Sequence, residues 1–251
     1  MIESGRDNCW DDWLVELANL GTVQLMTNSE ESDIFETVQV LSNLPQEQQD
    51  FLGKYVQYKN YPKNTFIYNP GEEADWVYFM VSGVVKTGTF NEEGKEVIKN
   101  ILYPGEMFGE LGLSGMAERP DFAGTLKGEV DVLRIPVRIL KELINKNPDV
   151  GLRMIEKLGE RISRSEKRLE RLIFDDARTR IIDFLHEQAK KNGKKFADET
   201  LVRHGFTHQD MANITGTSRQ LVTIVLNDLK RENLINFDRT SILIRDLDQL
   251  K

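Results

Sequence analysis

The chain has a single cysteine, Cys9, among its 251 residues. One cysteine cannot form an internal disulfide or ligate an iron–sulfur cluster alone, so cysteine-based redox clusters are excluded. Long apolar runs are also missing. The longest spans Val77 to Val81 behind Trp76, far below the roughly 20 residues of a membrane helix, and we interpret it as a buried strand. No basic and then apolar signal pattern opens the chain, so we expect a cytoplasmic protein without a membrane partner.

Positive charge is scarce in the first part of the chain. The net charge is −8 overall, distributed as −12 over residues 1–150, +1 over 151–176 and +3 over 177–251. The acidic total argues against a generic nucleic-acid coat, whereas an acidic front and a mildly basic back are typical of a sensor joined to a DNA-binding module. No catalytic triad, phosphate loop or supported carboxylate pair stands out, so the sequence does not predict an enzyme.

Turn signals organise residues 1–136. Residues 8–20 place apolar side chains at helical spacing and residues 27–33 are polar, which predicts a short helix and a linker. From Phe35 to Pro136, short apolar runs are separated by turn residues such as Asn69-Pro70-Gly71 and Pro104-Gly105. Regular turns between brief strands are typical of a sandwich or jelly roll. We expect helix to be the exception before position 137.

A long helix is predicted next, because no loop signal interrupts the chain from about Asn147 to Asp175. Gly151 and Ser165 are weak d sites of a heptad whose other a and d positions are Ile155, Leu158, Ile162, Leu169 and Leu172. This stripe predicts pairing with a second copy of the chain; a helix packed on its own domain is the alternative. Asp176 is the expected N-cap of a further helix from 179 to 190, and the break is a predicted hinge.

Two closely spaced helix starts follow in the last quarter of the chain. Thr207 with Asp210, and Thr217 with Gln220, both have the spacing of a capping box. Gly216 between them supplies a tight turn. Two short helices joined by such a turn indicate a helix-turn-helix.

The residues around that turn support this interpretation. The small Ala212 lets the two helices cross, and the expected shared core is Ile214, Val222 and Leu226. Strands at 234–235 and 241–244 around a polar turn at Asp238-Arg239 predict a wing. Polar groups able to contact base edges in a major groove lie on the first turn of the second helix: Ser218, Arg219, Gln220 and Thr223. A helical hairpin with solvated polar residues is the alternative.

Several motifs in the same order resemble one family. Asn69-Pro70-Gly71-Glu72, the run 77–83, the run 104–111 and the helix-turn-helix look like the cyclic-AMP receptor protein and Fnr (Crp/Fnr) family of transcription regulators, from about residue 35 onward. The resemblance implies an α+β fold. An N-terminal β-roll (a jelly roll of the cyclic-nucleotide-binding type) would span 34–146, a dimerisation helix and hinge 147–176, and a winged helix-turn-helix 177–251, after a helical extension and linker at 1–33.

The resemblance also implies an effector site. The family's contacting positions correspond here to Gly109, Glu110, Leu111, Arg119, Arg164 and Ser165. In the family the Glu meets a ribose hydroxyl and the Arg meets a cyclic phosphate. Two small residues normally follow that Arg, and in this chain Pro120 and Asp121 stand in their place. Proline lacks a backbone donor and aspartate adds negative charge beside a phosphate. We therefore expect no tight cyclic AMP binding. A different small effector, or an Arg119 held by Asp121 or Glu110 as an internal ion pair, are the two alternatives.

The predicted DNA contacts are Thr207, His208, Gln209, Thr217, Ser218, Arg219, Gln220 and Thr223. By resemblance, Thr207 and Gln209 hold phosphate and Arg219 lies at the start of the recognition helix. Gln220 and Ile224 replace a Glu and an Arg that are common in the family, so we expect a different target sequence. A haem or metal role for the three histidines is the lesser alternative, since His208 more simply offers a phosphate contact; no metal ligands are predicted.

Taken together, the residues and the resemblance predict a homodimeric regulator that binds a near-palindromic DNA site and works with RNA polymerase. The alternative from another class is a ligand-binding or protein-interaction module that carries a vestigial DNA reader.

Overall fold

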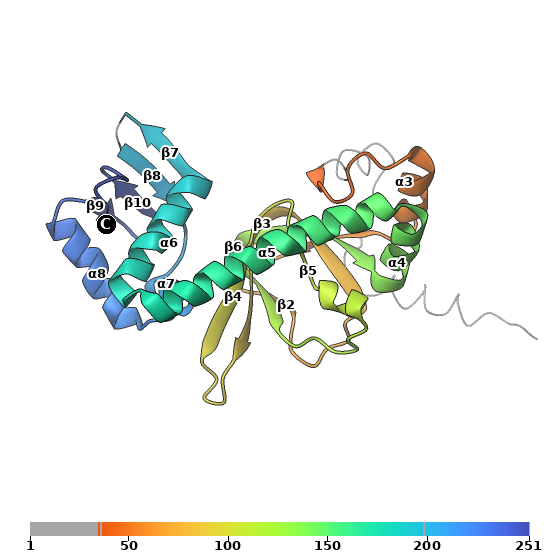
Figure 1. The fold of residues 1–251 in the computed structure, drawn as a ribbon, viewed down its shortest axis with the longest axis horizontal. Helices are drawn as coiled ribbons and strands as arrows, with labels where there is room; N and C mark the ends of the chain where they lie inside the picture. The colour runs from red at the N-terminus through yellow and green to blue at the C-terminus, as the bar shows by residue number, and fades with distance from the viewer. Residues whose placement is uncertain (1–34, 36, 198, 251) are drawn as a thin grey trace, which may run out of the picture.

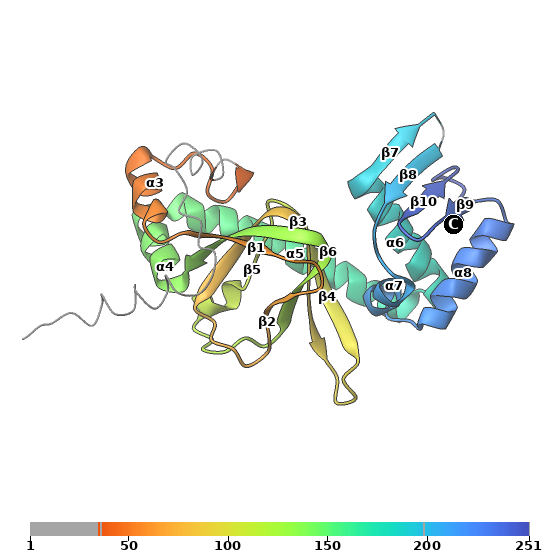
Figure 2. The ribbon, with the colours of Figure 1, turned by 180° about the vertical axis from the view of Figure 1, so that it is seen from behind.

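The computed structural model of the protein describes residue 35 and residues 37–197 and 199–250, shown as ribbons in Figures 1 and 2. The helix and linker predicted for residues 1–33 lie outside these described residues. The elements of the first part are α3 (Gln46–Gly53), β1 (Gln57–Tyr61), β2 (Phe66–Tyr68), β3 (Trp76–Phe90), β4 (Glu96–Leu102), β5 (Met107–Phe108), the 3-10 helix η1 (Glu110–Ser114), β6 (Phe122–Pro136), α4 (Val137–Lys146) and α5 (Pro148–Phe174). The second part contains α6 (Ala177–Asn192), β7 (Gly193–Phe196), β8 (Glu199–Arg203), α7 (His208–Thr215), α8 (Arg219–Arg231), β9 (Ile235–Phe237) and β10 (Ser241–Ile244).

The first part is a β-roll built on two long strands, β3 and β6, which pair antiparallel. β1 pairs with the outer side of β6, β4 continues the sheet beyond β3, and β2 and β5 pair with β6 and β3. Gly83 lies where the register of β3 against β6 shifts, at φ +82°, and a Cβ there would meet the carbonyl oxygen of Glu129 at 2.5 Å. Only glycine therefore lets the two strands approach at this irregular point. The predicted jelly-roll type of fold and the buried strand at Val77–Val81 are confirmed.

The predicted long helix is confirmed as α5, which runs without interruption from the β-roll to the second part of the chain (Figure 1). Pro148 occupies its first turn, where its missing N–H costs nothing. Asp176 caps the next helix, accepting a hydrogen bond from the Thr179 backbone N–H at 2.8 Å, as predicted. Among the described residues, no helix has the length and apolar character needed to cross a membrane.

The apolar stripe of α5 differs from the predicted one. Leu158 packs against the core of the β-roll, and a Cβ on Gly151 would touch Ile144 of α4 at 3.1 Å, so these two positions face the chain's own domain. Leu172 and Phe174 near the end of α5 are exposed, and so is a regular stripe of five aliphatic side chains: Leu152, Ile155, Ile162, Leu169 and Ile173, at 62%, 65%, 59%, 58% and 67% exposure. These five follow a heptad completed by 159 and 166, which we call the α5 seam, and the predicted member Leu172 is exposed next to it. Two stripes at helical spacing lie side by side, and the predicted heptad mixed members of both.

The second part is a winged helix-turn-helix. Helices α6, α7 and α8 enclose an apolar core with Ala212, Val222 and Leu226 completely buried and Ile214 packed at its edge, as predicted. A four-stranded antiparallel sheet in the order β7-β8-β10-β9 covers them. The wing strands β9 and β10 confirm the prediction within one or two residues, whereas the β7–β8 hairpin was not predicted.

The two parts also touch each other directly. Val84 and Leu126 of the β-roll belong to the apolar core of the second part. Lys127 donates from its amino group to the Arg203 carbonyl at 3.0 Å, and Arg168 of α5 donates to the carbonyls of Lys99 in β4 and Ile214 in α7. The DNA-binding part is therefore docked on the β-roll and is not held by the α5–α6 hinge alone.

Candidate effector and DNA-binding sites

The first helix of the helix-turn-helix begins with a complete capping box. The Asp210 backbone N–H donates to the Thr207 hydroxyl oxygen at 3.1 Å, and the Asp210 carboxylate accepts from the Thr207 backbone N–H at 2.8 Å. Gly216 then ends α7 in the left-handed conformation, at φ +65°. Both features were predicted from the sequence, and together they set the start of α7 and the turn into α8.

The second predicted cap is wrong by one residue. Ser218, not Thr217, is the N-cap of α8, because its hydroxyl oxygen accepts from the Leu221 backbone N–H at 3.1 Å. Thr217 is half-buried in the turn before the cap. Adjacent Thr and Ser residues offer two equivalent capping frames, and the tertiary packing of the turn selects the second one.

The first turn of α8 presents polar groups to solvent. Ser218, Arg219 and Gln220 are exposed, and in the part of the chain that the structure describes the Arg219 guanidinium has no hydrogen bond or ion pair. Thr223 differs from this expectation, since its hydroxyl donates to the Arg219 carbonyl at 3.0 Å and lies 2.9 Å from Nδ1 of His208. The hydroxyl hydrogen of Thr223 is thus used inside the protein, and we assign the N–H at Nδ1 of His208 as the donor to the Thr223 hydroxyl oxygen.

His208 and Gln209 lie on the first turn of α7, next to α8. Burial and the neighbouring Arg219 lower the pKa of His208, so the ring is neutral at pH 7 and offers a hydrogen bond instead of a charge. Gln209 is exposed and donates to the side-chain oxygen of Asn213 at 2.8 Å. Thr207, Gln209 and Arg219 therefore lie at the starts of the two helices that the turn joins.

At the centre of the predicted effector site, Arg119 is paired within the protein through its two terminal nitrogens, while its buried Nε has no hydrogen-bond partner among the described residues. Arg119 is 3% exposed, and its guanidinium donates to the carbonyls of Gly109 at 2.8 Å and Trp76 at 2.6 Å. It also lies 4.5 Å from the ring centroid of Tyr68, a cation–π contact. Gly109 is in the left-handed conformation, and a Cβ there would come within 2.6 Å of the Arg119 guanidinium. The predicted pair Gly109 and Arg119 is in contact, but the contact is between the two residues themselves.

Glu110 is also engaged, by a residue that sequence reasoning missed. Arg161 of α5 pairs with the Glu110 carboxylate at 2.9 Å and donates to the Met107 carbonyl. Both side chains of the pair are 15% exposed. The adjacent Leu111 is exposed on η1. The expected alternative, an ion pair of Arg119 with Glu110 or Asp121, is not present in the structure. Glu110 pairs with Arg161 of α5 instead, and no pattern in the neighbouring sequence predicts a pairing between such distant residues.

Asp121 is a half-buried carboxylate with charged neighbours of both signs. Burial raises the pKa of Asp121 most strongly, and neighbouring Glu110 adds to this, while Lys99 and Arg119 lower it. Pro120 beside it is exposed. An incoming phosphate would thus meet a partly buried carboxylate and a residue without an N–H donor.

Arg164 and Ser165 lie apart from these groups. Both line a cavity between β4, α5 and α6, which is lined by none of Gly109, Glu110, Leu111 and Arg119. Arg164 pairs with Glu106 at 2.6 Å, and Ser165 is exposed on α5. The structure therefore divides the predicted effector set between the β-roll and this cavity.

The three histidines are used in protein contacts. His186 Nε2 lies 2.7 Å from the Leu250 carbonyl, and Nδ1 of His204 accepts from the Phe206 backbone N–H at 3.0 Å. Within the described ranges, no three His, Cys, Asp or Glu residues are grouped as a metal site. Nothing in this geometry favours the haem or metal alternative.

Comparison with known protein families identifies the class of protein to which these two domains belong. Residues 58–147 match the cyclic nucleotide-binding domain, and residues 179–251 match the Crp-like helix-turn-helix domain. A sensor domain joined to a DNA-binding domain of these types defines an effector-responsive transcription regulator, which is not an enzyme.

Known proteins of the same architecture match most of the chain. The CRP-like cAMP-activated global transcriptional regulator of Mycobacterium tuberculosis is 29% identical over 199 residues, covering 79% of this chain and 88% of that protein. The c-di-GMP responsive regulator CLP of Xanthomonas campestris has a TM-score of 0.70 at 22% identity, covering 80% and 99% of the two chains. A CooA mutant from Carboxydothermus hydrogenoformans has a TM-score of 0.71 at 24% identity, covering 85% and 94%. The chain belongs to the Crp/Fnr family of transcriptional regulators.

Proposed function

We propose that the protein is a homodimer that binds a near-palindromic operator through the first turns of α7 and α8. The observation that carries this proposal is the free Arg219 guanidinium on the exposed first turn of α8, beside exposed Ser218 and Gln220. Arg pairs bidentately with guanine, and Gln pairs with adenine, in a major groove. Thr207, His208, Gln209 and Thr217 would position the phosphate backbone, and Thr223 would orient His208.

The α5 seam supports the dimer. Five exposed aliphatic side chains on one stripe of a single helix are the surface that a second copy would cover, and a two-fold pair is the commonest closed arrangement. Two recognition helices would then reach half-sites roughly 34 Å apart. In this proposal the sensor spans 34–146, the dimerisation helix and hinge 147–176, and the DNA-binding domain 177–251. In this proposal the protein binds its operator and works with RNA polymerase in the cytoplasm.

We also propose that cyclic AMP is not the effector of the β-roll. Arg119 already donates to two backbone carbonyls, Glu110 is paired with Arg161, and Asp121 adds a carboxylate at the site. A cyclic phosphate would have to break these contacts without the donors that Pro120 and Asp121 replace. The rest of the predicted effector set, Arg164 and Ser165, lines a separate cavity that a different ligand could enter.

Selection from random DNA duplexes tests the DNA-binding proposal. We expect enrichment of a near-palindrome with half-sites about one helical turn apart. An absence of any enriched sequence, with and without cell extract as a source of effector, would favour the vestigial-reader alternative.

Sedimentation of Ile162→Glu tests the dimer, since Ile162 is 59% exposed and its replacement disturbs no intramolecular core. We expect the wild type to sediment as a dimer and the variant as a folded monomer. A monomeric wild type would refute the seam, and an unchanged dimer in the variant would place the interface elsewhere.

Calorimetry with cyclic AMP tests the effector proposal. We expect no binding at micromolar concentration to the wild type. The double change Pro120→Ser with Asp121→Ala restores a donor and removes a negative charge, so it should gain measurable affinity. Micromolar binding by the wild type would show that the two substitutions do not close the site.

A further inference from the structure

The cavity between β4, α5 and α6 is strongly basic. It holds about 300 Å³, close to the lower bound of the volumes typical of small-molecule sites. Eight Lys and Arg side chains line it, against a single carboxylate, Glu187, in a chain whose net charge is −8. Its walls come from the sensor, from the long helix and from the DNA-binding domain, including Ile214 and Thr215 at the end of α7.

Much of this positive charge has no acidic partner. Arg164 is paired with Glu106, and Arg171 with Glu187 and Asp183. The arginines Arg168 and Arg180 donate to backbone carbonyls and form no ion pair among the described residues, although Glu187 and Asp176 act on them from a greater distance. For Lys167, Lys190 and Lys191, the described part of the chain contains no ion pair. Like charges gathered in a partly enclosed space repel one another, and a bound anion relieves that repulsion.

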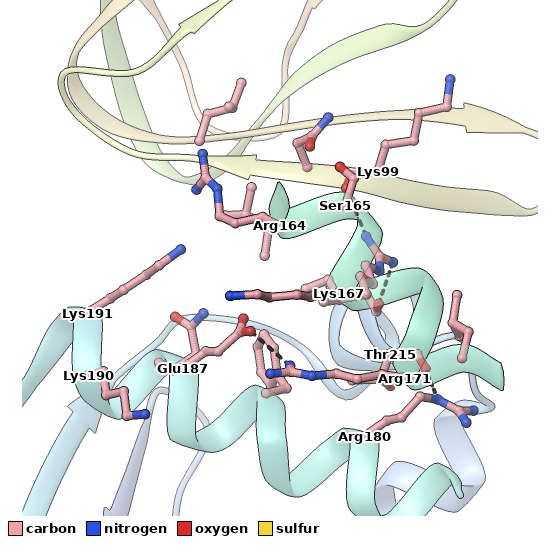
Figure 3. Close-up of a pocket in the computed structure, with 18 of the residues that line it drawn as sticks. Lys99, Arg164, Ser165, Lys167, Arg171, Arg180, Glu187, Lys190, Lys191 and Thr215 are labelled. Carbon is pink, nitrogen blue, oxygen red and sulfur yellow. Dashed lines mark hydrogen bonds and ion pairs between the residues drawn. The ribbon is translucent and has the colours of Figure 1, made fainter. Parts of the chain in front are cut away.

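The side chains are arranged around a common opening. Figure 3 shows Lys167 extending into the cavity from α5, with the amino group of Lys191 and the guanidinium of Arg164 directed toward the same opening. The rest of the wall is apolar and aromatic: Phe184 is buried, and Tyr103 donates from its hydroxyl to Gln188 at 3.1 Å. Separate cationic groups next to an apolar wall suit a ligand that has more than one anionic group and an organic body.

We propose that this cavity binds an organic molecule carrying two or more phosphate groups. Arg164 and Lys167 would contact it from the long helix α5, and Lys191 from α6 of the DNA-binding domain. The ligand would neutralise both sets of charges at once and hold the DNA-binding domain in one position against the β-roll. The site is separate from the Arg119 site, and only its effect on DNA depends on the function proposed above.

Calorimetry on the full chain tests binding without DNA, with ATP and inorganic pyrophosphate as probes at about 0.15 M salt. The test variant is Lys167→Ala with Lys191→Ala. The matched control is Lys63→Ala with Lys141→Ala, which removes the same charge from exposed positions outside the cavity. We expect saturable ATP binding by the wild type and the control, at least tenfold weaker binding by the test variant, and pyrophosphate at least tenfold weaker than ATP.

Three results would overturn the proposal: no saturable binding of either probe, equal loss of affinity in the test and control variants, or pyrophosphate binding as tightly as ATP. The last would indicate a site for simple anions. Duplex-binding titrations of the test variant distinguish a ligand site from a surface that contacts DNA directly. If ATP does not bind while the test variant weakens binding to all duplexes, the cavity residues contact DNA and the proposal is wrong. Failure of the wild type to bind any duplex would refute the proposed function and leave the ATP result standing.

Discussion

Arg119 in the β-roll and Arg219 at the start of α8 are the same side chain in opposite situations. Arg119 is 3% exposed, lies over the Tyr68 ring and donates to two carbonyls of its own domain. Arg219 is exposed, and the described structure gives its guanidinium no partner. The first is used to hold the protein together, and the second is available to another molecule.

The comparison shows why a family motif does not fix a residue's role. By resemblance both arginines were expected to contact a ligand or DNA, but two carbonyls of its own domain already accept hydrogen bonds from the terminal nitrogens of Arg119. A donor that is already paired must exchange its partners on binding, so its net gain is small. An unpaired exposed donor gives up only water. Variants of the two arginines should therefore differ in which property they change.

The largest effect is expected for Arg119→Ala on stability. Its loss leaves the buried carbonyls of Gly109 and Trp76 without donors, which costs about 3 kcal/mol of unfolding free energy. Urea unfolding measures this, with Arg219→Ala as the control that should change stability by less than about 0.5 kcal/mol. Equal losses in the two variants would remove the distinction between them.

Arg219→Ala should act on DNA instead. We expect a loss of about 1–3 kcal/mol on the preferred duplex and a relaxed base preference, because the side chain specifies sequence. Gln209→Ala should weaken all duplexes about equally, since a phosphate contact carries no sequence information. Binding titrations on selected and random duplexes measure both. If both variants lose the same affinity on both duplexes, Arg219 does not specify sequence.

Ser218 should contribute to stability as well as to the exposed face of α8. Ser218→Ala removes the N-cap of α8 and should cost about 1 kcal/mol of unfolding free energy. Thr217→Ala, one residue earlier, removes no cap and serves as the control, with a smaller loss. Thermal unfolding of the two variants compares them. A larger loss for Thr217→Ala would restore the capping frame first predicted from the sequence.

The smallest effect is a pH dependence where the two domains meet. Burial, with Lys127 nearby, lowers the pKa of His204 from 6.5 to about 4, against the opposing influence of Asp238. The unfolded chain therefore binds the proton first, and stability present above pH 6.5 is lost as the pH falls toward 4. Between about pH 7 and 6 the loss should be less than about 1 kcal/mol. His204→Asn keeps an acceptor for the Phe206 N–H, and its unfolding free energy should vary less over this range; an unchanged slope would contradict the assignment to His204.

Local patterns predicted the local structure well. The capping box at Thr207, the turn at Gly216, the cap at Asp176 and the uninterrupted α5 all depend on residues within a few positions of one another. The β7–β8 hairpin was not predicted, because its strands are rich in Lys and polar residues, with Phe196 exposed, and show little apolar alternation.

The partners of the site residues could not be predicted, because they come from distant elements. Arg161 meets Glu110 from 51 positions away, and Trp76 accepts from Arg119 across 43. The α5 stripe was misassigned for a related reason. Leu158 packs on the β-roll whereas Ile155 faces outward, and tertiary packing makes this choice between two stripes of equal periodicity.

The α5 seam makes DNA binding by the proposed dimer depend on the amount of protein in the cell. In the proposed dimer, Leu152, Ile155, Ile162, Leu169 and Ile173 are covered only when two chains meet. The fraction of chains able to span both half-sites then rises with the cellular copy number while the protein is scarce, and levels off once pairing is complete. The amount of the regulator then controls operator occupancy together with any small-molecule effector. While the protein is scarce, a modest change in its synthesis would change operator occupancy more than proportionally.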